Sequence, residues 1–71
     1  MNEVTYFMWY MYNRWSKEEA IAVFGENLGN HVFGKWCHYR ENGLGELYWY
    51  SELDNECRQK LVDRANEIYS R

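Results

Sequence analysis

The sequence predicts an all-α protein, a compact bundle of four to five short helices that forms a single small globular domain over residues 1–71. Three observations lead to this fold class. Apolar residues recur at intervals of three and four along most of the chain. Residues that begin and end helices stand between these runs, and proline is absent. A chain of 71 residues has room for one domain only.

The first segment, residues 3–15, is rich in the β-branched and aromatic residues that favour strands. As a strand it would be apolar on both faces and would have to be fully buried. As a helix it aligns one apolar stripe, which consists of Val4, Met8, Met11 and Trp15. We therefore expect a helix. The alternative is an α+β fold in which residues 4–12 and 46–50 form a small antiparallel sheet.

A second helix is expected over residues 17–24. Ser16 and Glu19 have the spacing of a capping box, in which the serine side chain accepts from the glutamate amide and the carboxylate returns to the serine amide. Gly25 is expected to end the helix, because glycine readily adopts the left-handed conformation common at helix C-termini.

A third helix follows, with an apolar stripe at spacings of four, four and three residues: Leu28, Val32, Trp36 and Tyr39. We expect Asn27 or Asn30 to cap its start, and Asn42-Gly43 to end it near residue 41. The same Asn-Gly pair also favours a hairpin between residues 36–40 and 44–50, which we rank second because the preceding spacing is helical.

Two glycines interrupt this third helix. Each costs about 1 kcal/mol inside a helix relative to alanine. We therefore expect Gly29 and Gly34 to allow a close approach of another backbone or to mark the start of the helix.

Two further helices complete the prediction. A short fourth helix is consistent with the row Leu44, Leu47, Tyr48 and Ser51, although residues 47–50 alone could form a strand. Asp54 is expected to cap the last helix. The inward row of that helix consists of Cys57, Leu61, Ala65 and Ile68.

Composition excludes several classes of function. Eight basic and eleven acidic residues argue against holding nucleic acid by bulk charge, although a local basic face remains possible. Two cysteines are too few for a disulfide-stapled secreted domain, so we expect a cytoplasmic protein. The start lacks the basic region of a signal peptide, and the apolar stretch at residues 4–12 is too short to span a bilayer. We expect no membrane association.

The sequence offers little for catalysis or cofactor binding. Cys37 and His38 are neighbours that diverge on a helix, so they do not form a nucleophile and base. His31, Cys37, His38 and Cys57 lack the close pairs typical of zinc sites. No glycine-rich phosphate loop is present. We expect a protein that is not an enzyme and has no catalytic residue, no metal and no cofactor.

The aromatic surplus suggests a function in binding. Fourteen of the 71 residues are aromatic. A domain of this size buries only about 60% of its unfolded surface. Two dense clusters, at residues 6–12 and 48–50, therefore cannot both turn inward completely. We predict a surface that binds a protein partner or a second copy of the chain, formed by Tyr6, Trp9, Tyr10, Tyr12, Tyr48, Trp49 and Tyr50.

The alternative function is a small helix-turn-helix-like DNA-binding regulator. Residues 16–40 have the outline of two helices joined at a glycine, and the second helix could enter the major groove. The side chains expected to contact nucleic acid are His31, Lys35, His38 and Arg40. Nearby acidic residues make this alternative the weaker one.

Overall fold

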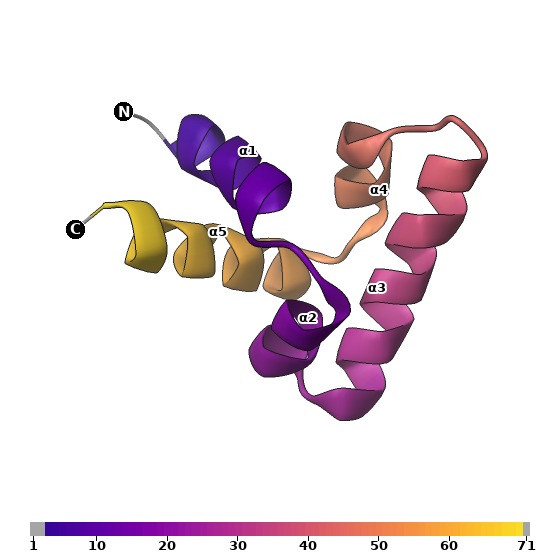
Figure 1. Ribbon diagram of the computed structural model, residues 1–71, viewed down its shortest axis with the longest axis horizontal. Coiled ribbons are helices and arrows are strands. Elements are labelled where there is room, and N and C mark those ends of the chain that lie inside the picture. The colour runs from indigo at the N-terminus through magenta and orange to yellow at the C-terminus, as the bar shows by residue number, and fades with distance from the viewer. Residues whose placement is uncertain (1–2, 71) are drawn as a thin grey trace.

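The computed structural model describes residues 3–70, with side chains from Thr5 onward, and these residues form five helices and no strand. The helices are α1 (Glu3–Asn13), α2 (Lys17–Phe24), α3 (Glu26–Glu41), α4 (Glu46–Glu52) and α5 (Asn55–Tyr69) (Figure 1). The predicted all-α class is confirmed. The α+β alternative is wrong, because both of its expected strands lie in α1 and α4. A helix can bury one side of residues 4–12 without burying the other.

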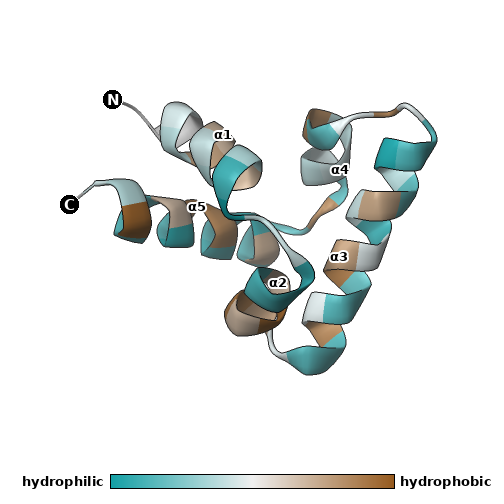
Figure 2. Ribbon diagram, viewed as in Figure 1, coloured by the Kyte–Doolittle hydropathy of each residue, from teal (hydrophilic) through white to brown (hydrophobic). Residues whose placement is uncertain are grey.

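The five helices form a small globule around one core. α1 and α5 lie side by side and run in opposite directions, so that the first turn of α1 and the last turn of α5 share one end of the molecule (Figure 1). α2 packs against both α3 and α5, and α4 packs on α3. Teal and brown bands alternate along α3 and α5, as expected for helices that bury one face (Figure 2).

Each helix contributes to the core. The buried side chains without measurable exposure are Tyr10 of α1, Ala20 of α2, Trp49 of α4, and Leu61 and Ala65 of α5. Val32 supplies the buried side chain from α3. The predicted stripes of α3 and α5 are largely confirmed, although Leu28 remains 40% exposed. The row predicted for the fourth helix, Leu44, Leu47, Tyr48 and Ser51, is instead exposed. In α1, Met11 is buried and Met8 is half-buried, while Trp15 follows the end of the helix and the Val4 side chain lies outside the described part.

Aromatic rings fill the space between the helices. Trp15, in the turn between α1 and α2, is the centre of this packing. Its ring centroid lies 5.5 Å from that of Trp49, 6.0 Å from Phe33, 6.2 Å from Tyr10 and 6.4 Å from Trp36. Rings from four parts of the chain thus supply the bulk that few aliphatic residues could provide.

Two predicted helix caps are present. The Ser16 hydroxyl accepts a hydrogen bond from the Glu19 amide at 3.1 Å, and an Asp54 carboxylate oxygen accepts from the Cys57 amide at 2.8 Å. The Glu19 carboxylate, expected at the Ser16 amide, accepts instead from Tyr10 and Arg64. The prediction that Asn27 or Asn30 caps α3 is wrong. Gly25, with a φ of 88°, ends α2 and begins α3 at once, which places both asparagines inside the helix.

The Asn42-Gly43 pair ends α3 as predicted, and the hairpin alternative is wrong. Gly43 has a φ of 72° and its amide donates to the Arg40 carbonyl at 3.1 Å. The next amide, of Leu44, donates to the Tyr39 carbonyl at 2.9 Å. These two bonds form a Schellman motif, which satisfies carbonyls at the helix end and turns the chain toward α4.

The two glycines inside α3 differ. Gly29 is buried against α2, and a Cβ atom added there would lie 2.7 Å from the Ile21 Cα and 2.8 Å from the Ala20 carbonyl oxygen. The expectation of a close backbone approach is confirmed for Gly29. It is wrong for Gly34, where an added Cβ would meet nothing within 4 Å.

Candidate functional site

Two of the seven rings predicted at the surface belong to the core. Tyr10 and Trp49 have no measurable exposure, so their predicted surface location is wrong. Tyr10 packs in the core, and its hydroxyl donates to Glu19 at 3.0 Å. Trp49 is inserted against α3, where its indole N–H donates to the Val32 carbonyl at 3.2 Å.

The other five predicted rings lie on α1 and α4, and three of them pack against rings of a neighbouring helix. Tyr6 and Tyr50 are half-buried, and Tyr50 packs on Phe7 with ring centroids 4.6 Å apart. Trp9 and Tyr12 are exposed on α1, where Trp9 packs edge-on against Tyr69 of α5. Tyr48 is exposed on α4 and packs edge-on against Tyr39 of α3. The exposed rings of the two predicted clusters thus rest on different helices.

Three large apolar side chains are exposed in and just before the first turn of α4, and we call them the α4 apolar face. It consists of Leu44, Leu47 and Tyr48, which are 47%, 68% and 48% exposed. Leu44 and Leu47 were missed as candidate surface residues. The sequence does hold a pattern that could have identified them, because their row and Trp49 occupy different sides of a short helix and only one side can be buried.

Acidic side chains flank this face. Glu52 lies one turn after Tyr48 in α4, and the interaction of its carboxylate with the tyrosine hydroxyl raises the pKa of Tyr48. Glu46 lies in the first turn of α4. The α4 side of the face is therefore negatively charged.

A second exposed feature, which we call the α3 hollow, lies on the neighbouring helix. It is lined by Asn30, His31, Gly34, Lys35, His38 and Tyr39. Three of the four residues predicted for nucleic-acid binding come together here. The fourth, Arg40, lies elsewhere, with its guanidinium 5.1 Å from the centroid of the Trp36 ring and beside Cys37 and Glu41 in a different hollow. The prediction that all four residues share one face is therefore wrong.

Tyr39 connects these two features. Its side chain lines the α3 hollow, and its ring meets the Tyr48 ring at a centroid distance of 5.5 Å and an angle of 90°. The contact between Tyr39 and Tyr48 therefore places the α3 hollow, with its one cationic side chain Lys35, next to the α4 apolar face.

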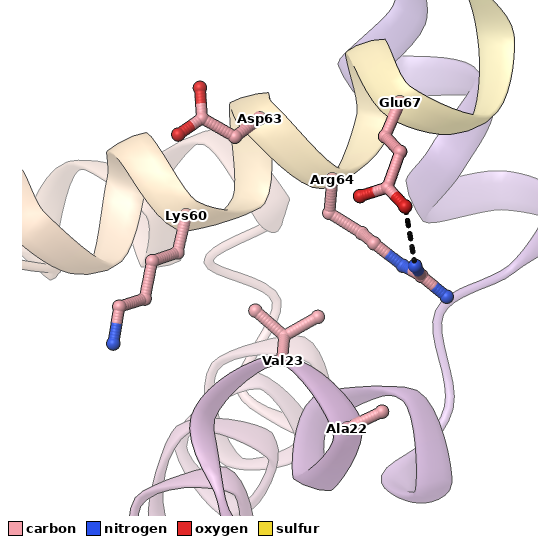
Figure 3. A pocket seen from close by; sticks show the side chains of 6 residues that line it. All are labelled: Ala22, Val23, Lys60, Asp63, Arg64 and Glu67. Carbon is pink, nitrogen blue, oxygen red and sulfur yellow. Dashed lines mark ion pairs between the residues drawn. The ribbon is translucent and has the colours of Figure 1, made fainter.

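A further hollow, of about 320 Å³, lies between α2 and α5 (Figure 3). Its charges are largely paired. Arg64 bonds Glu19 at 2.6 Å and lies 3.6 Å from Glu67. Lys60 and Asp63 leave α5 in opposite directions (Figure 3). This arrangement joins helices and offers no converging set of groups for a ligand.

The remaining reactive groups are dispersed. Cys37 and Cys57 are free thiols, and burial raises the pKa of Cys57. Over residues 3–70, no three His, Cys, Asp or Glu side chains lie together in a way that could hold a metal ion. In the same part of the chain, none of the five helices has the length and apolar character needed to cross a membrane.

Comparison of the chain with protein-family models, with curated proteins and with solved structures finds no match.

Proposed function

We propose that this protein is a non-enzymatic interaction module that binds a protein partner through the α4 apolar face. The observation that carries the proposal is the exposure of three large apolar side chains within five consecutive residues, next to the partly buried Tyr39. Single exposed apolar residues are common, but a group of them on a small domain is typical of an interaction surface.

The setting of α4 supports this role. Full burial of a leucine side chain contributes about 1.5–3 kcal/mol, yet a domain with few aliphatic residues leaves Leu47 largely exposed. Trp49 anchors the helix from behind through its burial and its bond to Val32. The face is therefore held in place before any partner arrives, which reduces the entropy lost on binding.

Peptide display tests the proposal. Twelve-residue peptides are selected on the full-length protein, and the affinity of a recovered peptide is measured by fluorescence polarisation. Tyr48→Ser and Leu47→Ser should each weaken binding at least tenfold, as expected for central interface residues. Tyr12→Ser is the matched control, because Tyr12 is 75% exposed on α1. Failure to recover peptides, or equal losses in all three variants, would reject the proposal.

One observation favours the DNA-binding alternative: His31, Lys35 and His38 share an exposed hollow on the second of two consecutive helices. Two others weigh against it, the separate location of Arg40 and the net charge of −3. Binding to duplex DNA that weakens steeply between low and moderate salt would support this alternative.

A further inference from the structure

The α3 hollow has an unusual cause. Gly34 lies inside α3, has no positive φ, and has open space where a side chain would stand. No turn or close packing requires a glycine there, in contrast to Gly29. The effect of Gly34 is a gap in the helix surface between His31, Lys35 and His38.

The middle of α3 differs in charge from the rest of the chain. Residues 27–40 contain Lys35, both histidines and Arg40, which lines a different hollow, while Glu26 and Glu41 lie at the two ends of the helix. The other six basic residues and all eleven acidic residues lie elsewhere, so the remainder of the chain carries a net charge of −5. His31, Lys35 and His38 are exposed, and they bring an ammonium group and imidazole N–H donors to the rim of the hollow.

We propose that the α3 hollow receives a carboxylate side chain of the same peptide segment whose apolar residues bind the α4 apolar face. This inference rests on the proposed function and specifies the partner as an acidic, apolar peptide. The link is Tyr39, which lines the hollow and contacts Tyr48. Glu46 and Glu52 lie on α4 and repel a negative charge there. The carboxylate of the peptide should therefore bind at the α3 hollow and not beside α4.

A peptide suits this surface better than a nucleic acid does. The hollow holds one cationic side chain, Lys35, and the neighbouring surface consists of leucine and tyrosine side chains without a further cation. The negative charge of the rest of the molecule would repel an extended phosphate backbone. A peptide with one carboxylate next to apolar residues matches both parts of the surface, the carboxylate at the α3 hollow and the apolar residues at the α4 apolar face.

The first test uses the displayed peptides and their sequences. Peptides recovered on the wild-type protein should be enriched in aspartate or glutamate next to leucine or aromatic residues. For a synthesised peptide, Lys35→Glu should weaken binding about fivefold, since it reverses one exposed charge. Lys17→Glu, the same change at an exposed lysine of α2, is the matched control and should leave the affinity unchanged.

The second test fills the hollow. Gly34→Gln should raise the melting temperature, because glutamine favours helix more than glycine does and the space is open. The same change should weaken peptide binding, because the new side chain occupies the hollow. A stabilised protein that binds less well separates loss of the site from loss of the fold.

The outcomes distinguish this inference from the proposed function. If Tyr48→Ser weakens binding while Lys35→Glu and Gly34→Gln do not, the acidic-peptide inference is wrong and the interaction module stands. If Tyr48→Ser has no effect, the proposed function itself is wrong. If a 20-base-pair duplex binds more tightly than any peptide and loses affinity in Lys35→Glu, a nucleic acid replaces the peptide as the partner.

Discussion

Glu19 holds three helices together through one carboxylate oxygen. Oε1 accepts from the Tyr10 hydroxyl of α1 at 3.0 Å and from Arg64 Nε of α5 at 2.6 Å, while Glu19 itself belongs to α2. Only 17% of the Glu19 side chain is exposed, so the carboxylate depends on these partners for its polar contacts. Of the two groups that donate to this carboxylate, the Tyr10 hydroxyl belongs to a residue of the core.

This contact makes stability sensitive to alkaline pH. Burial, and then the charge of Glu19, raise the pKa of Tyr10 above its ordinary value of 10.0. The unfolded chain therefore ionises first, and stability falls as the pH rises past 10. By pH 11 the loss of stability from this group is about 1.4 kcal/mol. Urea unfolding at pH 8 to 11 should show a smaller decline for Tyr10→Phe than for the wild type. Tyr12→Phe is the control, and equal declines in all three proteins would contradict the prediction.

The two glycines of α3 should respond to alanine in opposite directions. At Gly29 the new Cβ would lie 2.7 Å from the Ile21 Cα, and backbone cannot move aside easily, so Gly29→Ala should destabilise by about 1–3 kcal/mol. At Gly34 the space is open, and Gly34→Ala should stabilise by about 1 kcal/mol through helix propensity. Urea denaturation measures both. If both substitutions stabilise the protein, α2 and α3 do not approach each other closely at Gly29.

At the scale of elements, the limits of α2 and α5 and the end of α3 could be predicted because they depend on local chemistry, whereas the start of α3 was predicted wrongly at Asn27 or Asn30. Ser16, Gly25, Gly43 and Asp54 act on amides and carbonyls within a few residues of themselves. The orientation of α4 could not be predicted in this way. Its seven residues include apolar side chains on every side, and the inward side is selected by a distant partner, the Val32 carbonyl that accepts from Trp49.

The candidate site, too, could be predicted from the sequence only in part. Tyr48 and the row of His31, Lys35 and His38 could be predicted, since helical spacing alone places the three α3 residues on one side. Their connection through Tyr39 could not, because it depends on how α4 folds back on α3. The hollow at Gly34 was missed because a glycine inside a helix usually indicates close packing.

Two leucines test the orientation of α4. Leu47 is 68% exposed, whereas Leu61 of α5 has no measurable exposure. Leu47→Ala should change the free energy of unfolding by less than about 0.5 kcal/mol, as is usual at the surface. Leu61→Ala should cost about 2–5 kcal/mol through lost burial and a cavity. Thermal or urea unfolding compares them directly. A large loss in the free energy of unfolding for Leu47→Ala would mean that α4 buries the side that carries Leu47.

At the scale of the whole molecule, aromatic rings take the place of an aliphatic core. The packing around Trp15 joins the α1–α2 turn to α3 and α4, while Tyr10 connects it to α1. This use of large rings explains why only part of the aromatic surplus reaches the surface. The exposed part is divided, with Trp9 and Tyr12 on α1 and Tyr48 on α4.

The size of the α4 apolar face determines what it can hold. Three partly exposed side chains offer a few hundred Å² at most, within the usual range for the largest patch on a monomer. A stable dimer buries about 800 Å² on each subunit. The face is therefore sufficient for a short peptide and insufficient for permanent self-association.

The protein should accordingly be a monomer of 8.8 kDa in sedimentation equilibrium at concentrations up to about 100 µM, since a patch this small gives weak association at most. Its Cα radius of gyration, 11.4 Å, agrees with the roughly 11 Å expected for one compact chain of this length. Leu47→Ser should leave the sedimentation unchanged. A concentration-dependent dimer that Leu47→Ser abolishes would instead identify a second copy of the chain as the partner of the α4 apolar face.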